Sequence, residues 1–474
     1  MESKLRLLDP EAVAQLAMGF HGRLIQPADP DYEIARRVRN GLIDRSPAII
    51  ARCHGTADVV AAVNFAREQR LAVSVRGGAH NVAGLATNDG GIVIDLSGMR
   101  AVLVDPASET AYAQGGATWG DIDRETQMFG LVAPGGVIST TGIGGLTLQG
   151  GLGWLRRKYG ASVDSVKSVE IVTADGQVRT ASTTENPDLF WAVRGAGNNF
   201  GVVTRFEFEL YPIGPIIYVA APFFAVSDAP TIMEAFRTFV KSTPDEVTSM
   251  MLYYWVPPGP PFPEELWGQP AIITPIVYSG DSEEGERVLA PVRQFATPIF
   301  DLSGTYPYVV LQSMLDEEYP EGWLYYWKST YLNELSAELL ETFMRIGTSR
   351  PTPMTGVAIW QMGGAFGRVQ EDAMAFANRS APFLGTIEAS WQDPADNERC
   401  IAWARDAWAM LRRFGPGSLY PNFAGFGEEK DELARAAFGG NYERLVELKT
   451  KYDPGNLFHI NLNIPPQPLA VAAD

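Results

Sequence analysis

The chain has 474 residues, a length that predicts two or three domains. Of these residues 46% are hydrophobic and 20% charged, a balance typical of a soluble globular protein. A formal net charge of −18 argues against binding to nucleic acid or to an anionic membrane surface, since either partner requires a basic face. Two cysteines and four scattered histidines predict neither a disulfide framework nor a metal site. The chain also lacks a signal-like start or a membrane-spanning run, so we expect a cytoplasmic protein.

The first part of the chain predicts a β-α-β unit that ends in a glycine loop. We expect a helix over 9–20, a strand over 47–52, a helix over 56–68 and a strand over 71–75. That strand runs into the segment Arg76, Gly77, Gly78, Ala79, His80, Asn81 and Gly84. The N–H groups of such a loop can converge on an anion, phosphate above all, and Arg76 can add charge. By itself, however, the segment is more often a turn with an incidental histidine.

A second glycine-rich segment follows the strands expected at 91–96 and 101–105 and a helix at 119–129. Eight glycines fall between Gly135 and Gly153, among them Gly142, Gly144, Gly145 and Gly150. Glycine loses conformational entropy on folding, so this density requires a physical reason. The interleaved residues are too apolar for a flexible linker. Close approach of the backbone to a bulky ligand is therefore the favoured interpretation.

Downstream, a hairpin is expected at 164–181 around Asp175-Gly176, then a helix at 186–194. A third glycine segment, which contains Gly201, Val202 and Val203, enters a strand that extends to about residue 211. The composition then becomes rich in aromatics and proline, which predicts a second domain over 215–418 with helices at 228–242, 336–346 and 393–414 and a strand at 355–364. The last part holds Tyr420 and Asn422, helices at 428–438 and 442–452, and the alternating Asn461 and Asn463.

Taken together, these segments resemble the berberine-bridge-enzyme-like branch of the vanillyl-alcohol-oxidase, or PCMH-type, FAD oxidoreductases. The similarity runs in order over nearly the whole chain. It implies an α+β, two-domain PCMH-type fold, in which 1–214 and 419–474 form the FAD-binding domain and 215–418 forms an α+β substrate domain with an antiparallel sheet backed by helices. The resemblance places FAD against the loop glycines, the segment at Gly201–Val203, and Asn461 and Asn463.

The resemblance also implies a covalent link between the flavin and His80, which matches the histidine that is bonded to the flavin 8α-methyl group. Many relatives carry a second link through a cysteine. Ile138 stands at that position here, and neither Cys53 nor Cys400 lies nearby in the sequence. We therefore expect a single link through His80, and with it a small, partly apolar substrate.

For catalysis, Tyr420 matches a tyrosine that acts as base or hydrogen-bonding partner in several relatives, and Asn422 would position substrate or flavin. A phenol with the ordinary pKa of about 10 needs a neighbouring cation to act as a base at neutral pH. Tyr159, with Lys158 beside it, and Gln361 are candidates for the substrate side. A carboxylate base has no clear counterpart, with Glu388 the remaining candidate.

The sequence thus predicts an FAD-dependent oxidase that dehydrogenates a small alcohol, amine or similar molecule by hydride transfer and returns the electrons to O2 as H2O2. Two alternatives stay open: a flavin dehydrogenase with another acceptor, and a drug-binding resistance protein of the same fold. Which small molecule is oxidised does not follow from the sequence.

Overall fold

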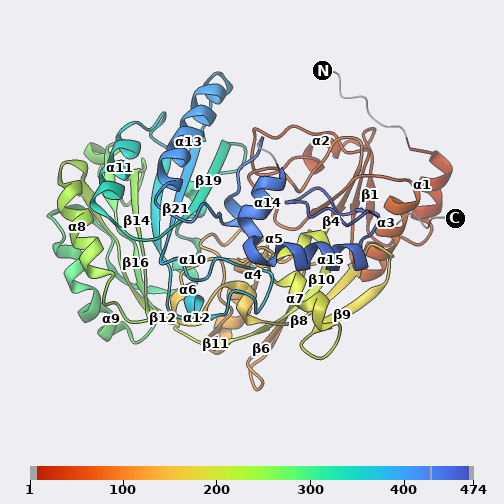
Figure 1. Cartoon of the computed structure of the whole chain (residues 1–474), viewed down its shortest axis with the longest axis horizontal. Helices are drawn as coiled ribbons and strands as arrows, with labels where there is room; N and C mark the ends of the chain where they lie inside the picture. Colours follow the sequence, from red (N-terminus) through yellow and green to blue (C-terminus); the bar gives the residue numbers. More distant parts are fainter. Residues whose placement is uncertain (1–7, 428–429, 469–474) are drawn as a thin grey trace.

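The chain folds into two bodies that meet along a broad interface (Figure 1). The computed structural model describes residues 8–427 and 430–468. Residues from the beginning and the end of the chain form one body, and the middle of the chain forms the other. In the described part of the chain, no helix has the length and apolar character needed to cross a bilayer.

The first body begins with a four-stranded sheet in the order β1-β2-β4-β3. Its strands are β1 Arg23–Ile25, β2 Ile49–Arg52, β3 Val73–Arg76 and β4 Ile92–Asp95, and the accompanying helices are α1 Pro10–Ala17, α2 Tyr32–Ala35 and α3 Thr56–Glu68. Strands β2 and β3 are both parallel to β4, which lies between them. The predicted strand–helix–strand unit is confirmed, and β4 lies between its two strands.

An antiparallel five-stranded sheet, in the order β5-β6-β10-β8-β9, completes the frame of this body. Its strands are β5 Val102–Asp105, β6 Thr110–Gln114, β8 Val166–Thr173, β9 Val178–Ser182 and β10 Gly201–Glu209. The surrounding elements are α4 Trp119–Thr126, β7 Leu131–Val132, α5 Ile143–Thr147, α6 Arg156–Tyr159, α7 Pro187–Ala196 and β11 Tyr211–Pro212. The hairpin predicted around Asp175-Gly176 is confirmed. Helix α5 was not predicted, because the glycines of this segment disfavour helix formation.

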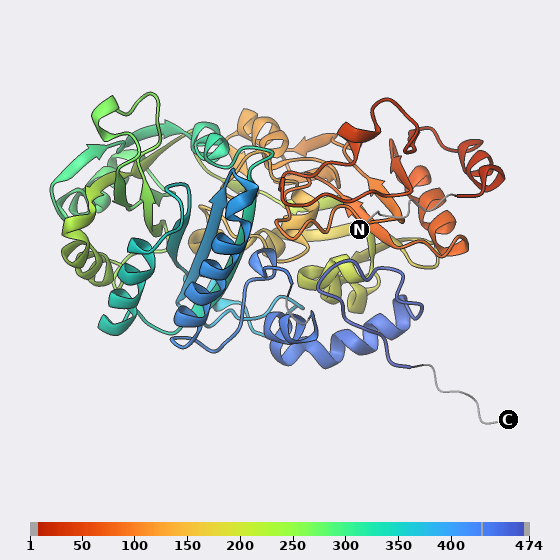
Figure 2. The same cartoon turned by 90° about the horizontal axis from the view of Figure 1, so that it is seen from above.

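The C-terminal segment returns to the first body. Its helices are α14 Lys430–Phe438 and α15 Tyr442–Tyr452, of which α15 lies beside α7 (Figure 2). The start predicted for the first of them, at 428–429, lies outside the described residues. Lys449 is fully buried and its Nζ donates to Asp453 Oδ2 at 2.7 Å and to the carbonyls of Asn199 and Phe458. This buried ammonium fastens the end of the chain to the entrance of β10.

The second body is built on a ten-stranded antiparallel sheet. Its strands are β12 Ile216–Ala220, β13 Pro222–Ala225, β14 Val247–Trp255, β15 Pro270–Ile273, β16 Ile276–Tyr278, β17 Pro298–Asp301, β18 Gly304–Pro307, β19 Leu324–Leu332, β20 Gly356–Gln361 and β21 Phe383–Trp391. Its helices are α8 Ala229–Phe239, α9 Ser282–Leu289, α10 Tyr308–Ser313, α11 Ala337–Thr348, α12 Ala365–Arg368 and α13 Asn397–Arg412. Helices α8, α11 and α13 bury their apolar sides on one face of the sheet. The other face packs against the first body. The expected α+β arrangement of a sheet backed by helices is therefore confirmed.

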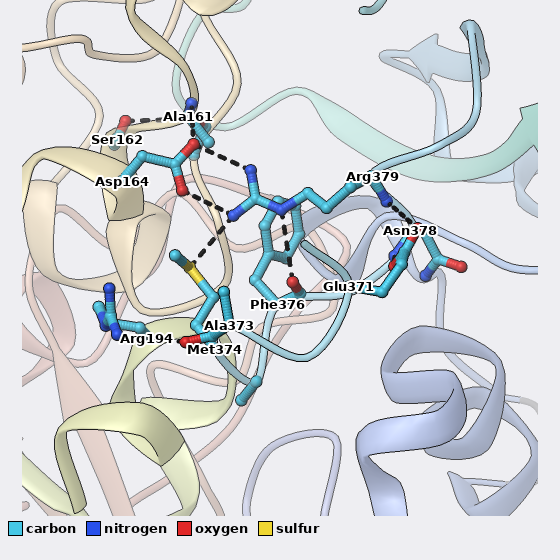
Figure 3. A network of polar contacts seen from close by, with 12 residues as sticks. Ala161, Ser162, Asp164, Arg194, Glu371, Ala373, Met374, Phe376, Asn378 and Arg379 are labelled. Carbon is cyan, nitrogen blue, oxygen red and sulfur yellow. Dashed lines mark hydrogen bonds and ion pairs between the residues drawn. The ribbon is translucent and has the colours of Figure 1, made fainter. Parts of the chain in front are cut away.

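Arginines hold the two bodies together. Arg379 is 1% exposed, and its Nη1 and Nη2 donate to Asp164 Oδ2 and Oδ1 at 2.9 and 2.7 Å (Figure 3). The rings of Phe366 and Phe376 lie 4.9 and 4.6 Å from its guanidinium carbon. Arg156 of α6, in the first body, donates across the interface to the backbone carbonyls of Gln361 and Ser249 in the large sheet of the second. A two-point ion pair of this kind fixes orientation as well as distance.

We expect Arg379→Ala to lower the free energy of unfolding by about 3–5 kcal/mol, because it leaves the carboxylate of Asp164 buried without its partner. Urea denaturation would measure the change. The matched control is Arg23→Ala, which removes a similar two-point contact to Asp31 from a side chain that is 55% exposed. An exposed pair contributes at most about 1 kcal/mol, so equal losses in the two variants would contradict the structural role of Arg379.

Candidate active site

A cavity lies where the glycine segments of the first body face the large sheet of the second. From the first body it is lined by Val73, Val75, Gly77, Gly78, Ala79, His80, Asn81, Val82, Leu85, Ala86, Leu96, Gly115, Val137, Ile138, Thr141, Gly142, Gly144, Gly145, Leu146, Leu148, Gln149, Leu152, Asn198, Gly201, Val203, Tyr420, Asn422, Phe423, Phe458, Ile460 and Asn461. The second body adds Trp327 and Trp360. Among the described residues, no aspartate, glutamate, lysine or arginine lines it.

The two glycine loops meet at a point where neither tolerates a side chain. A Cβ on Gly78 would lie 2.4 Å from the backbone nitrogen of Gly142, and a Cβ on Gly142 would lie 2.3 Å from that of Gly78. Gly144 is similarly confined by the carbonyl of Gly115 at 2.9 Å. By contrast, a Cβ on Gly145 would meet no atom within 4 Å. Gly78, Gly142 and Gly144 thus let the loops close on each other, and Gly145 leaves the cavity open.

His80 lies at the mouth of this cradle in a fixed and neutral state. Its Nε2 is 3.0 Å from Arg39 Nη1 and 3.0 Å from Thr140 Oγ1, and its Nδ1 is 3.2 Å from Thr141 Oγ1. A guanidinium can only donate, so Nε2 accepts and Nδ1 carries the proton. Burial and the charge of Arg39 lower the pKa of His80 to about 3. The imidazole is therefore uncharged at neutral pH.

The loop at Gly78–His80 and the side chain of Asn461 offer the groups that a dinucleotide cofactor such as FAD would need. Within the described residues, no backbone carbonyl accepts from the N–H groups of Gly78, Ala79 or His80, which leaves this loop free to bind phosphate. Asn461 lines the cavity, and its buried Oδ1 has no partner among the described residues. A buried acceptor without a partner is costly, and a bound ligand with a donor group would remove that cost.

Several residues predicted to bind the cofactor lie outside the cavity. Arg76 is buried and turned away, with its guanidinium donating to the carbonyls of Ala35 and Arg36. Gly84 and Gly150 have positive φ, and a Cβ on them would strike Ile43 and the ring of Phe376. Side-chain alternation along β10 turns Val202 into the core beneath the first sheet, whereas Val203 lines the cavity. Asn463 is also absent from the lining, although its buried Oδ1 lacks a partner among the described residues.

Tyr159 and Gln361, the residues predicted for the substrate side, are not among the residues that line this cavity. Tyr159 stacks on Tyr211 and donates to the carbonyl of Pro212. The amide of Gln361 binds Ser249, Val240 and Thr243 in the interior. Neighbouring side chains of a strand point to opposite faces, so the lining residue of β20 is Trp360 rather than Gln361. Lys158 donates to the carbonyl of Ser279 and is likewise engaged elsewhere.

Tyr420 and Asn422 do lie in the cavity wall, and their geometry favours a hydrogen-bonding role over a basic one. The phenol oxygen of Tyr420 accepts from the Leu152 N–H at 3.1 Å and from Asn422 Nδ2 at 2.8 Å. Burial raises its pKa to about 12 despite these hydrogen bonds. The cation that a tyrosine base would need is absent among the described lining residues. Tyr420 is therefore a protonated donor at neutral pH.

Glu388 is a buried carboxylate behind this wall, although it is not itself among the lining residues. It pairs across β19 and β21 with Trp327, so both side chains point from the same face of the sheet, the one turned toward the cavity. Its Oε2 accepts from Tyr319 Oη at 2.6 Å and its Oε1 from Thr386 Oγ1 at 2.7 Å. Burial raises the pKa of Glu388. A raised pKa makes the carboxylate a stronger base than an exposed glutamate.

Sequence reasoning missed Arg39, Trp327 and Trp360. Arg39 bridges His80 and the backbone carbonyl of Tyr319, 280 residues away, a contact without any local sequence signal. Trp327 stands among several aromatic residues of β19, and Trp360 is the single aromatic residue of β20; only the strand register shows that these two rings line the cavity.

No thiol lines the cavity. Ile138 forms part of the lining at the position where a second, cysteinyl link was considered. Cys53 and Cys400, the only cysteines of the chain, are buried in the hydrophobic cores of the two bodies. Burial raises the pKa of both thiols, which keeps them protonated and unreactive.

Comparisons with known proteins identify the chain as an FAD-dependent oxidoreductase. The FAD binding domain family matches residues 47–182, and the family described as berberine and berberine like matches 420–465. The chain is 30% identical to an FAD-linked oxidoreductase of Dictyostelium discoideum over 98% of this chain and 99% of that protein. It is 31% identical to (R)-6-hydroxynicotine oxidase of Paenarthrobacter nicotinovorans over 95% and 98%. The crystal structure of 6-hydroxy-D-nicotine oxidase from Arthrobacter nicotinovorans superposes with a TM-score of 0.81 at 28% identity, covering 94% of this chain and 98% of that one. Physcomitrella patens BBE-like 1 shares the fold, with a TM-score of 0.86 at 22% identity and coverage of 97% and 99%.

We expect Gly78→Ala to reduce both stability and flavin content, because its Cβ would force the two glycine loops apart. Overpacking of this kind costs about 1–3 kcal/mol. Thermal unfolding and the ratio of flavin to protein absorbance would report the two effects. Gly19→Ala is the control, since a Cβ there meets no atom within 4 Å. Normal flavin content in Gly78→Ala would show that the loop contact does not shape the cradle.

Proposed function

The chain belongs to the berberine-bridge-enzyme-like FAD-linked oxidoreductases, and from that membership we propose that it is an oxidase of a small molecule. The observation that supports the proposal most directly is the cavity itself. One wall is a glycine cradle with His80 at its mouth, and the facing wall presents aromatic side chains from the other body. Such a cavity can hold a flavin and a small substrate together.

FAD, when bound, would accept a hydride from a substrate carbon and pass the electrons to O2 to give H2O2. The chain's own groups would bind, orient and exchange protons around that chemistry. The loop N–H groups at Gly78–His80 and Asn461 would hold the cofactor. Tyr420 would donate a hydrogen bond to the substrate, with Asn422 holding the phenol in place.

His80 would be the covalent attachment point, and the only one. The contacts of Arg39, Thr140 and Thr141 fix the ring, and the lowered pKa keeps it uncharged. To form the link, one ring nitrogen would give up its present hydrogen bond, with Arg39 at Nε2 or with Thr141 at Nδ1. Ile138 offers no thiol for a second link. With His80 available and no cysteine at position 138, we expect a single covalent link to the flavin.

Glu388 is our candidate for the base that takes the proton from the substrate. It is buried behind the lining residues, it points from the cavity side of the sheet beside Trp327, and burial raises its pKa, which makes its carboxylate a stronger base. Tyr319 holds its Oε2 and so orients the carboxyl group.

The relatives that are named oxidases support O2 as the electron acceptor. The test is steady-state turnover of a reducing substrate with and without O2, together with a peroxide assay. Peroxide formed in equal amount to product is the expected result. Turnover that needs an artificial acceptor while the reduced flavin persists in air would favour a dehydrogenase instead.

Acid precipitation of the native protein should leave a yellow, fluorescent flavin on the polypeptide, because the His80 link survives denaturation. His80→Ala should release the flavin to the supernatant, whereas His54→Ala, at an exposed position, should retain it. Free flavin from the native protein would refute the covalent link.

Glu388→Gln should slow anaerobic flavin reduction by about 10²- to 10⁴-fold, the usual contribution of a general base. In the native enzyme, the rate should fall as the pH drops through the pKa of Glu388, because the protonated carboxyl group cannot accept a proton. Glu388→Gln should lose this acidic limb. Stopped-flow measurement across pH 5–10 would show both effects.

Tyr420→Phe is the contrasting variant. The phenol stays protonated up to about pH 12, so its loss should remove one hydrogen bond and slow reduction by only about 3- to 10-fold. The acidic limb should remain. A limb that vanished in Tyr420→Phe and persisted in Glu388→Gln would reverse the two roles.

A further inference from the structure

Asp316 of the second body reaches across the interface to the second glycine segment of the first. It begins the short 3-10 helix Asp316–Glu318, which follows α10 in the chain. Its Oδ1 accepts from the backbone N–H of Ser139 at 2.8 Å, and its Oδ2 accepts from Ser139 Oγ. Both donors of Ser139 therefore end on one carboxylate, which fixes the orientation of this residue as well as its distance.

Ser139 belongs to a tight turn that supplies two of the contacts of His80. A backbone hydrogen bond of 3.2 Å between the first and last residues closes the turn 138–141. Thr140 Oγ1 lies 3.0 Å from His80 Nε2, and Thr141 Oγ1 lies 3.2 Å from His80 Nδ1. The carboxylate from the second body holds this turn at its second residue, so it fixes the backbone that presents both hydroxyl groups to the imidazole.

The same segment of the second body holds His80 from another side. The carbonyl of Tyr319 accepts from Arg39 Nε at 2.9 Å, and Arg39 Nη1 lies 3.0 Å from His80 Nε2. Residues 316–319 thus reach the imidazole along two routes, one through Arg39 and one through the turn 138–141. Both routes start in the second body, although His80 itself belongs to the first.

The covalent step requires close control of the position of this ring. His80 would give up its ring proton and form a C–N bond to the flavin 8α-methyl carbon, which loses one hydrogen as a proton. Both protons and two electrons would pass to the flavin ring, which O2 would reoxidise to give H2O2. Reacting atoms must be held about 3–3.5 Å apart, and a misplacement of about 1 Å can slow a reaction about 10²-fold. Whichever ring nitrogen reacts, a threonine of the turn lies beside it.

We propose that Asp316 is a positioning residue for His80: by fixing the turn 138–141 from the second body, it holds the imidazole where attachment to the flavin takes place. The inference rests on the covalent link proposed above. Asp316 does not line the cavity, so it acts through Ser139. Because both routes to the imidazole cross the interface, attachment follows the docking of the two bodies.

The test is the rate at which covalent flavin appears after FAD is added to the flavin-free, full-length chain, measured by acid precipitation at timed intervals. Asp316→Ala removes both acceptors. Asp316→Asn keeps an oxygen for the backbone N–H of Ser139 and an amide that can donate to its Oγ. The control is Asp301→Ala, because Asp301 also accepts from one side chain, that of Arg293, and from one backbone N–H, that of Ser303, but within the second body.

We expect Asp316→Ala to slow attachment by about 10- to 100-fold, because the imidazole loses its fixed position. Asp316→Asn should restore most of the native rate, and Asp301→Ala should leave it unchanged. Ser139→Ala, which loses only the hydroxyl contact, should slow attachment by about 3- to 10-fold. Since Ser139 and Asp316 form one contact, the double variant should be no slower than Asp316→Ala alone.

Three results would overturn the proposal: a native rate in Asp316→Ala, equal slowing in Asp316→Ala and Asp301→Ala, or an Asn variant as slow as the Ala variant. Equal slowing with the control would mean that attachment reports only a general loss of stability. If Asp316→Ala does not fold, Ser139→Ala decides, and a native rate in that variant would also overturn the proposal.

Histidine NMR on the flavin-free chain separates this proposal from the proposed function. The chain has four histidines, so His80→Ala assigns the signals of that ring. In Asp316→Ala the ring signals of His80 should shift, because the two hydroxyl groups are no longer held at its nitrogens, whereas Asp301→Ala should leave them in place. If the native protein attaches no flavin covalently, the proposed link fails and the NMR comparison alone decides the role of Asp316. Unchanged signals of His80 in Asp316→Ala would overturn that role.

Discussion

The site depends on the contact between Gly78 and Gly142. Each of these residues would place a Cβ within about 2.4 Å of the other loop's backbone nitrogen, so the loops close only because both lack a side chain. That closure brings His80, at the end of the first loop, beside Thr140 and Thr141 of the second. The position of the imidazole is thus a consequence of backbone packing between two segments that are sixty residues apart in the chain.

Around this contact, the protein keeps charge out of the cavity and uses it to hold the structure together. Arg76 and Arg156 are buried and directed at backbone carbonyls, and Arg379 is paired with Asp164 across the interface of the two bodies. These three guanidinium groups therefore stabilise the fold and are not available to bind an anionic ligand. What remains inside is an apolar space with neutral hydrogen-bonding groups, where small differences in a ligand's polarity have large energetic effects.

One chain of contacts joins the two walls of the site. Arg39 binds His80 on one side and the carbonyl of Tyr319 on the other, and the phenol of Tyr319 binds Glu388 at 2.6 Å. The proposed attachment point and the proposed base are therefore linked through two residues, Arg39 and Tyr319. A change in the packing of the two bodies would alter both, which gives a physical reason for the buried ion pair at their interface.

The sequence by itself determined the class of the protein, the α+β architecture and the segments that carry the cofactor site. Glycine density and turn pairs such as Asp175-Gly176 act within a few residues, so they can be recognised without knowing the fold. Tertiary structure decided which residue of each segment faces the cavity: Gly145 and Val203 do, whereas Arg76, Gly84, Gly150 and Val202 do not. The tertiary structure also places Trp360, and not the predicted Gln361, in the cavity lining. It adds Arg39 and Trp327 to the residues of the site. These choices depend on strand alternation and on contacts between distant segments, and a one-residue difference in register, invisible in the sequence, turns a side chain from the cavity into the core.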